Sequence, residues 1–216
     1  MVAQAVDYLA MIRAMPPGTV AMLNYISWAT YEALLKALDE QPRYRLSYDE
    51  GRLEIMTVSA EHEKPAGLLP HLILVLAEEM DVEFLSLWST TMRKQKKAKG
   101  ADPDDCYYFK NFKKVAQKKR IDLIVDPPPD LGIEIDVTNR SLSKFPIYAA
   151  IGVPEFWRYY RDQMWFYGLV ESEYQPVTYS VRFPFFPPET VTVFLRKGAL
   201  EGTVSMVKEF RKWAQT

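Results

Sequence analysis

The sequence is poor in cysteine, and this limits the chemistry open to it. Its one cysteine, Cys106, excludes an intrachain disulfide and a cysteine-based zinc site. No apolar run approaches the length that a membrane-spanning helix needs. The first residues carry Asp7 and Arg13 and have no basic segment ahead of an apolar one, so they do not resemble a secretory signal. These absences make the cytoplasm the expected location.

An excess of positive charge is also lacking. The net charge is −1, which excludes the global basic surface expected of a tight, non-specific DNA-binding protein. The Lys and Arg residues are nevertheless concentrated in 93–99 and 110–120, on both sides of an acidic stretch. Two interpretations stay open: these segments are solvated loops, or they hold a phosphate backbone near the carboxylates.

The hydrophobic pattern predicts one mixed α/β domain over residues 1–216. The length of 216 residues and the 48% hydrophobic content suffice for one substantial core. Alternating runs predict strands at 43–48, 52–57, 82–88, 91–97, 104–109, 131–137, 155–160, 164–168 and 174–183. Helices are predicted near the N-terminus, at 28–40, from 59 onward with a break or kink at Pro70, and at 142–151, 189–196 and 202–213. The expected fold is a central mixed sheet flanked by helices, with an N-terminal arm (1–26) and a C-terminal helical extension (187–216).

Two acidic stretches carry the chemistry of the chain. The first is Asp102-Pro103-Asp104-Asp105, and the second is the apolar run 129–137, which contains Glu134 and Asp136. These last two stand at i and i+2, so on a strand they point to the same face. Burying them is costly unless a cation or hydrogen bonds compensate. Hydrolysis of a phosphodiester needs a cation, and Mg²⁺ takes one or two carboxylates, so the pattern indicates a nuclease-type metal site.

The stretch from Glu54 to Tyr160 resembles the Uma2 family, formerly DUF820. The resemblance rests on segments that follow one another in a fixed order: Gly51–Met56, Ser59–Glu63, Pro103-Asp104, Pro129–Ile135, Lys144, Tyr148 and Gly152–Trp157. It implies a restriction-endonuclease-like fold of the PD-(D/E)xK superfamily. It also implies an endonuclease that uses Mg²⁺ or Mn²⁺, acts on DNA and pairs as a homodimer.

The resemblance also implies roles for individual residues. Asp104 would be the Asp of the Pro-Asp motif, and Glu134 the acidic residue of the (D/E)xK motif. Asp136 occupies the usual lysine position, so Lys144 on the following helix would take the place of that lysine. Glu54 would be an accessory acid that reaches the metal from a neighbouring element.

Each role has a structural alternative. Asp104 could cap a turn, Glu134 could form an ion pair with Lys144 or an arginine, and Lys144 could lie on the surface. Glu54 sits in an alternating strand, where a solvent-facing side chain is the alternative to a ligand. Asp136 is either a second metal ligand or a cap for the loop 138–141.

Other polar and aromatic residues are weaker candidates. His62 is a possible base or simply a polar residue at a helix start, and Tyr148 is expected to pack beside Lys144. Asp102 and Asp105 are expected to be solvated, and Asp130 to be a turn residue. The aromatic residues at strand spacing could stack on bases, but core or interface positions explain them better: Tyr107, Tyr108, Trp157, Tyr159, Tyr160, Trp165 and Tyr167.

Three functional classes remain open. The first is the metal-dependent nuclease, and the second is a nucleic-acid-binding or assembly module that keeps the fold without cleavage. Metal binding separates these two, because a pure binding module does not need the carboxylates. The third is a hydrolase or lyase for a small substrate, which predicts a closed apolar pocket instead of a basic groove.

Overall fold

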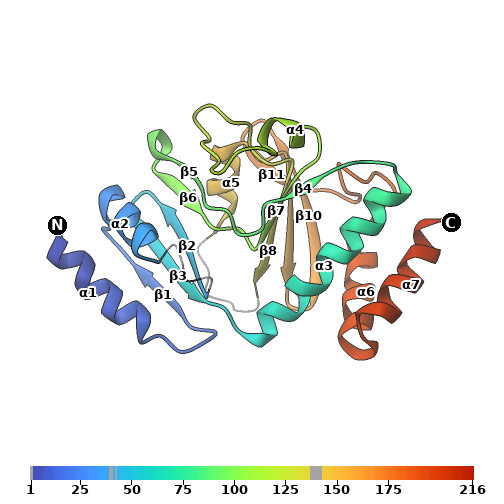
Figure 1. Ribbon diagram of the computed structural model, residues 1–216, viewed down its shortest axis with the longest axis horizontal. Helices are drawn as coiled ribbons and strands as arrows, with labels where there is room; N and C mark the ends of the chain where they lie inside the picture. Colours follow the sequence, from blue (N-terminus) through green and yellow to red (C-terminus); the bar gives the residue numbers. More distant parts are fainter. Residues whose placement is uncertain (1, 39–40, 42, 137–142) are drawn as a thin grey trace.

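Two β-sheets flanked by helices make up the molecule (Figure 1). The computed structural model describes residues 2–38, 41, 43–136 and 143–216. The five-stranded sheet is antiparallel and has the order β1 (Val20–Leu23), β3 (Arg52–Thr57), β2 (Tyr44–Asp49), β6 (Lys99–Ala101), β5 (Met92–Lys94). The six-stranded sheet has the order β11 (Glu173–Pro176), β10 (Gln163–Val170), β9 (Glu155–Tyr160), β8 (Leu131–Asp136), β7 (Asp105–Tyr108), β4 (Leu85–Ser86). Strands β8 and β9 run parallel, so this sheet is mixed, as predicted.

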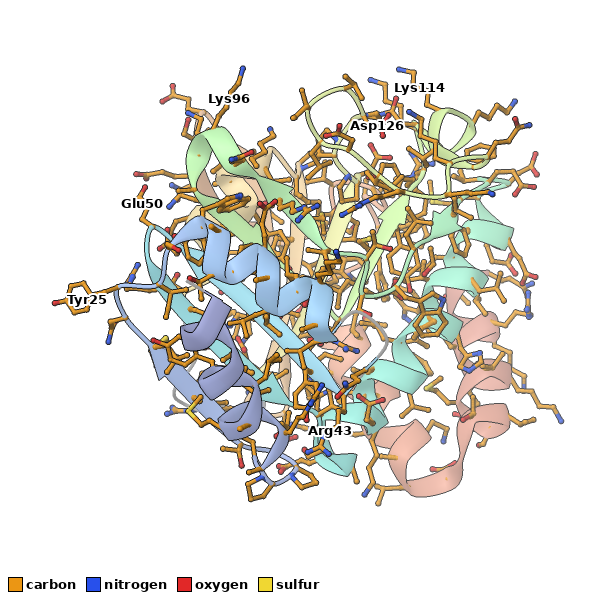
Figure 2. The ribbon with its side chains drawn as sticks, turned by 60° about the vertical axis from the view of Figure 1, so that its left-hand side comes forward. Tyr25, Arg43, Glu50, Lys96, Lys114 and Asp126 are labelled. Carbon is orange, nitrogen blue, oxygen red and sulfur yellow. The ribbon has the colours of Figure 1, made fainter. Side chains whose placement is uncertain are left out.

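The helices cover the outer faces of both sheets. Helices α1 (Val2–Arg13) and α2 (Trp28–Leu38) lie over the five-stranded sheet and come forward in the turned view of Figure 2. Helices α3 (Ala60–Glu79), α6 (Pro188–Glu201) and α7 (Thr203–Ala214) pack on one face of the six-stranded sheet. The short α5 (Phe145–Ile151) lies on its other face and connects β8 to β9. Within the described residues, no helix combines the length and apolar composition needed to cross a membrane.

Strand alternation sends apolar and polar side chains to opposite faces. In β8, Ile133 and Ile135 join the core under α3, so Glu134 and Asp136 point to the side of α5. In the five-stranded sheet, Leu46, Leu53 and Ile55 join the core under α1 and α2. The alternate positions of β2 and β3 therefore face away from that core, toward the six-stranded sheet. The polar faces of the two sheets meet where β8 ends.

Helix α3 runs unbroken from Ala60 to Glu79, so the break at Pro70, one of the two predicted alternatives, is wrong. Each proline in it, Pro65 and Pro70, removes one helical hydrogen bond. The apolar side chains that follow compensate for this loss, since Leu72, Ile73 and Leu76 are fully buried. Burial in the core therefore overrides the local preference.

Some predicted strands are shorter than expected. The predicted strand 174–183 ends at Pro176. Val177 N–H still donates to the Phe166 carbonyl, but further along the segment main-chain donors bond to side chains: Ser180 Oγ accepts from Phe183 N–H, and Glu155 accepts from Val181 and Arg182 N–H. The predicted strand 91–97 is β5 followed by a 3₁₀ turn (Gln95–Lys97), and the predicted strand 82–88 reduces to β4.

Three further elements were not predicted. These are β1, β6 and the one-turn helix α4 (Phe112–Val115). Strand β1, in the segment expected to be an N-terminal arm, pairs with β3. Helices α6 and α7 add Leu195, Met206 and Phe210 to the main core.

Gly100 in β6 is expected to tolerate no side chain. A Cβ there would collide with the hydroxyl of buried Tyr31 and lie 3.1 Å from two of its ring carbons. Gly100→Ala should lower the free energy of unfolding by about 1–3 kcal/mol, measured by urea denaturation. Adding Tyr31→Phe should recover part of this loss. Gly67→Ala is the control, because that helical glycine has nothing within 4 Å of the new Cβ and the change should be neutral or stabilising.

Candidate active site

Glu134 in β8 is the centre of a buried polar cluster. Its side chain is 1% exposed, and both carboxylate oxygens are occupied. Lys144 Nζ donates to Oε2, and the Tyr148 hydroxyl donates to Oε1. Lys144 directly precedes α5 and Tyr148 lies one turn into it, so the two side chains reach Glu134 from the same helix end. Tyr148 was expected to lie beside Lys144, and the structure brings the two side chains together on the carboxylate of Glu134.

The cluster has an excess of carboxylates over the one buried lysine that they surround. Burial raises the pKa of Glu134 to about 8, and the neighbouring charges of Asp104 and Asp136 add to the rise while Lys144 opposes it. Burial alone would lower the pKa of Lys144. Four carboxylates outweigh that effect and raise it: those of Glu134, Asp136, Asp104 and Glu54. Lys144 therefore stays charged, in a pocket of surplus negative charge.

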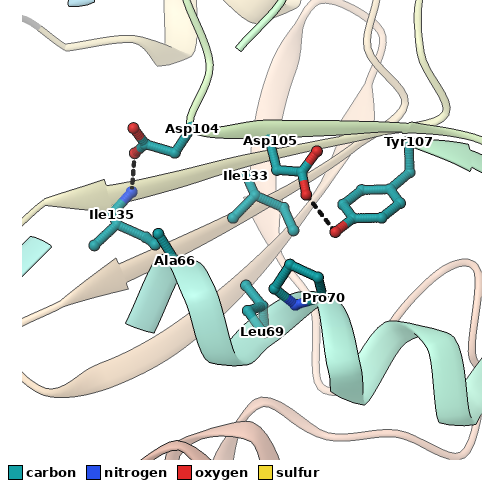
Figure 3. A pocket seen from close by; sticks show the side chains of 8 residues that line it. All are labelled: Ala66, Leu69, Pro70, Asp104, Asp105, Tyr107, Ile133 and Ile135. Carbon is teal, nitrogen blue, oxygen red and sulfur yellow. Dashed lines mark hydrogen bonds between the residues drawn. The ribbon is translucent and has the colours of Figure 1, made fainter. Parts of the chain in front are cut away.

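Asp104 stands just before β7 and is anchored to β8. Its Oδ2 accepts the Ile135 N–H at 2.7 Å (Figure 3), and its own N–H donates to the Ile133 carbonyl. Its Oδ1 lies 2.9 Å from His62 Nε2, at the start of α3, and 3.7 Å from Arg45 Nε, in β2. Asp104 Oδ1 is fully buried, and the side chains of His62 and Arg45 are its neighbours.

The Asp104–His62 contact shifts both groups toward their charged forms. Burial by itself would raise the pKa of Asp104, but His62, Lys144 and the Ile135 N–H together lower it. Burial would likewise lower the pKa of His62, yet the carboxylates of Asp104 and Glu63 raise it. His62 is thus both a residue at a helix start and a direct neighbour of Asp104.

Asp105 is structural, although it adjoins Asp104. The expectation that Asp102 and Asp105 are solvated is wrong, since both are buried. Asp105 accepts hydrogen bonds from Ser86 Oγ, from Cys106 N–H and from the Tyr107 hydroxyl, the last drawn in Figure 3. The cavity between it, Asp104 and α3 is about 10 Å³, room for one water at most.

Asp130 is also structural. Its Oδ2 accepts the N–H groups of Phe109 and Lys110, which confirms its interpretation as a turn residue. The aromatic residues Tyr107, Tyr108 and Trp157 are at most 1% exposed, which confirms a core position for these three.

Glu54 and Asp136 extend the cluster on two sides. Glu54 in β3 is 2% exposed, so the solvent-facing alternative is wrong, and its charge reaches Lys144. Asp136 ends β8 and accepts a 2.6 Å hydrogen bond from Arg158 Nε in the parallel neighbour β9. Its alternative role as a cap for 138–141 concerns a loop that lies outside the described residues.

The donor set fits a hard divalent cation such as Mg²⁺. Within the described residues, no three acidic, histidine or cysteine side chains form a complete metal site by themselves. Mg²⁺ does not need one, because it usually takes one or two protein carboxylates and completes its shell with water and substrate. The buried Oδ1 of Asp104 and the raised pKa of Glu134 mark two oxygens that a cation would stabilise.

Two arginines of this region were not predicted. Arg45 approaches Asp104 from β2, and Arg158 binds Asp136 from β9. Their strand alternation was visible in the sequence, because each stands between apolar neighbours (Tyr44 and Leu46, Trp157 and Tyr159). That pattern gives the face on which a side chain lies, but not the strand that it meets.

The fold and the site define a protein of the restriction-endonuclease-like class. A mixed sheet carries adjacent strands with Asp104 and Glu134 at one end, and Lys144 follows directly before the next helix. This confirms the predicted fold class.

The chain belongs to the Uma2 family. Residues 28–196 match the sequence profile of this family, described as "Putative restriction endonuclease". The fold is similar to that in the crystal structure of a putative nuclease belonging to DUF820 from Anabaena variabilis. The two proteins are 14% identical with a TM-score of 0.50, over 69% of this chain and 90% of the other. No curated protein matches the sequence. Together, family and fold support a nuclease in general terms.

Proposed function

We propose that the chain, as a single restriction-endonuclease-like domain, is a metal-dependent endonuclease that hydrolyses phosphodiester bonds in DNA. The observation that carries the proposal is the burial of four carboxylates around one buried lysine. Burying such a cluster costs stability. Perturbed ionisable groups of this kind gather at functional sites, so a function explains why the cost is tolerated.

The proposal assigns roles to five residues. Asp104 and Glu134 hold Mg²⁺ or Mn²⁺, with Glu54 as an accessory acid and Asp136 as a weaker candidate ligand. The ion would polarise the scissile phosphate and activate the attacking water. Lys144 would stabilise negative charge that develops on the phosphate. Lys144 and Tyr148 donate to the two oxygens of Glu134 and so hold the carboxylate in place.

The surroundings of the site favour a nuclease over a hydrolase or lyase for small molecules. The cavity beside Asp104, at about 10 Å³, is too small for any substrate. A larger groove of about 760 Å³ runs nearby and is lined by five basic residues, which suits a polyanion. A small-substrate enzyme would need the reverse, a closed apolar pocket at the carboxylates.

The test is nicking of supercoiled plasmid with Mg²⁺ or Mn²⁺. Asp104→Asn should lower the rate at least about 100-fold, because it weakens the metal site and removes transition-state stabilisation. Asp105→Asn is the matched control. Asp105 is adjacent to Asp104 but structural, and an asparagine amide can keep most of its hydrogen bonds. It should cut at a rate close to that of the wild type.

Two outcomes would overturn the proposal. A wild type that neither cuts plasmid nor binds Mg²⁺ or Mn²⁺ in calorimetry leaves a binding or assembly module with structural carboxylates. Cleavage that survives Asp104→Asn at full rate excludes this site from the reaction.

The proposal extends to assembly and location. A homodimer would let two sites act on the two strands of a duplex, and Trp165 on β10, 45% exposed, is a candidate interface residue. Sedimentation should then give twice the 25.0 kDa chain mass. The single cysteine, which is buried and reduced, suits the cytoplasm.

A further inference from the structure

A groove of about 760 Å³ lies between α2, β2 and two loops. Its walls come from α2, from residues 89–93 and from residues 119–121, which are far apart in the sequence. Figure 2 shows α2 at the front, with the loop region of Lys114 and Asp126 above it. This volume suits a drug-sized ligand, so it would hold a short length of one strand and not a duplex.

The walls of the groove are positively charged. Five basic residues line it against two acidic ones, Glu32 and Asp102; the basic set is Lys36, Arg45, Arg93, Lys119 and Arg120. Arg93 is paired with Glu32 at 3.1 Å. Lys119 and Arg120 are exposed and form no ion pair within the described part of the chain. The positive charges of Lys119 and Arg120 are therefore available to bind the phosphates of a nucleic-acid backbone.

The floor of the groove adjoins the candidate active site. Asp102 lies there, two residues before Asp104, and is bound to β2 in both directions: its N–H donates to the Leu46 carbonyl, and its Oδ2 accepts the Leu46 N–H at 3.0 Å. Its Oδ1 is buried and makes no geometrically complete hydrogen bond, although the Thr91 side chain lies beside it. Arg45 also lines the floor and reaches toward Asp104 Oδ1 at 3.7 Å. The groove thus leads to the carboxylates and has the buried carboxylate of Asp102 at its end.

We infer that this groove binds an unpaired nucleic-acid strand, with Lys119 and Arg120 on its phosphates and Asp102 on the amino group of one base. The inference rests on the proposed function and deepens it by naming the form of the substrate. A phosphate would be repelled by Asp102, so the group above it must be a base. Asp and Glu accept from the exocyclic amine of cytosine, whereas thymine offers no amine. Pairing engages only one hydrogen of this amine, so the requirement for an unpaired strand comes from the size of the groove and the burial of the site.

The burial of the site carboxylates supports an unpaired strand. The side chains of Asp104 and Glu134 are 2% and 1% exposed, so a rigid duplex lying on the surface would keep its phosphates away from them. A flexible single strand can bend into the groove and bring one phosphate toward Asp104. Enzymes that do chemistry on a base solve a comparable problem of access by acting on single strands or extruded nucleotides.

The test is fluorescence anisotropy with 15-nucleotide oligo(dC), oligo(dT) and a 15-base-pair duplex in EDTA at pH 7.5. The wild type should bind oligo(dC) at least about 5-fold more tightly than oligo(dT), and both more tightly than the duplex. Lys119→Ala/Arg120→Ala should weaken binding of both single strands about 10-fold and lower the salt slope by about 1.4. Asp102→Asn should remove the preference for oligo(dC) and leave the affinity for oligo(dT) within about 2-fold of the wild type.

Lys208→Ala/Lys212→Ala is the matched control, because it removes two lysines from α7 at the far end of the molecule and should change nothing. Tighter binding to the duplex, or no effect of the Lys119/Arg120 change, would overturn the inference. Equal binding of the two single strands by the wild type would overturn the contact of Asp102. Because EDTA prevents cleavage, binding can succeed while plasmid nicking fails, and the reverse, so the inference and the proposed function are tested separately.

Discussion

Lys144→Met is expected to destabilise the protein by about 3–5 kcal/mol at pH 9 and to abolish nicking. Methionine has similar length but no charge, so the buried Glu134 would lose its cation and would have to remain ionised without compensation or take up a proton at pH 9. Breaking a buried pair by removing one partner costs this much because the remaining charge is uncompensated. The loss is to be measured by urea denaturation, followed by tryptophan fluorescence.

The double variant separates charge from packing. Adding Glu134→Gln to Lys144→Met removes the uncompensated carboxylate, so most of the lost stability should return, whereas nicking should stay absent. Lys197→Met is the surface control: its ion pairs with Glu201 and Glu209 lie at the surface, and its loss should leave the stability close to that of the wild type. If Lys144→Met were as stable as the wild type at pH 9, Glu134 would not depend on Lys144 for its charge balance.

The central contacts of the buried cluster, those of Glu134 with Lys144 and Tyr148, can be predicted from the sequence. Glu134 and Asp136 are two residues apart in an apolar run, and strand geometry puts them on one face. Lys144 and Tyr148 are four residues apart at the start of a short helix, which also puts them on one face. Because a short connection joins the two elements, local periodicity is enough to bring Glu134, Lys144 and Tyr148 together.

The remaining contacts depend on how distant segments pair, which local patterns do not contain. Arg45 meets Asp104 because β2 bonds to the segment around Asp102, more than fifty positions along the chain. Arg158 meets Asp136 because β8 and β9 pair in parallel register, with Asp136 opposite Tyr160. The strand β6 was missed for the same reason: its three residues have no alternation of their own and are held by β2 and β5.

Predictions that relied on local polarity or local helix preference were wrong where burial in the fold determined the structure. Asp102 and Asp105 look solvated in a run of acidic residues, yet main-chain and hydroxyl donors compensate both. Pro70 looks like a helix breaker, yet the core on α3 outweighs the lost hydrogen bond. Both errors share a cause: the stabilising partners come from elsewhere in the fold.

The affinity for Mg²⁺ or Mn²⁺ is expected to rise roughly 50-fold between pH 6 and pH 8. A carboxylate must lose its proton to bind a metal. Glu134 has a pKa of about 8 because of its burial and the nearby charges of Asp104 and Asp136, opposed by Lys144. Its ionised fraction, ~1% at pH 6, is about one half at pH 8. Calorimetric titration with Mn²⁺ across this range measures the effect.

Glu134→Gln identifies the group that titrates. Tyr148 also contacts Glu134, but its raised pKa keeps it protonated throughout. The pKa of Asp104 is lowered, so this group stays ionised, and the proton on His62 can add only a smaller slope. Glu134→Gln should therefore bind Mn²⁺ weakly with little dependence on pH, whereas Asp105→Asn should follow the wild type. An affinity of the wild type that did not change with pH would exclude Glu134 as a ligand with a raised pKa.

The raised pKa of Glu134 also determines whether the stability of the metal-free protein rises or falls with pH. Glu134 binds its proton more tightly in the folded protein, with a pKa of about 8, than in the unfolded chain, where the ordinary value is 4.5. Its contribution is therefore complete below pH 4.5 and is lost as the pH rises toward 8. A bound cation favours the ionised form and reverses this trend. The metal-free protein should thus lose stability relative to Glu134→Gln as the pH rises from 5 to 8, and saturating Mn²⁺ should restore it in the wild type alone.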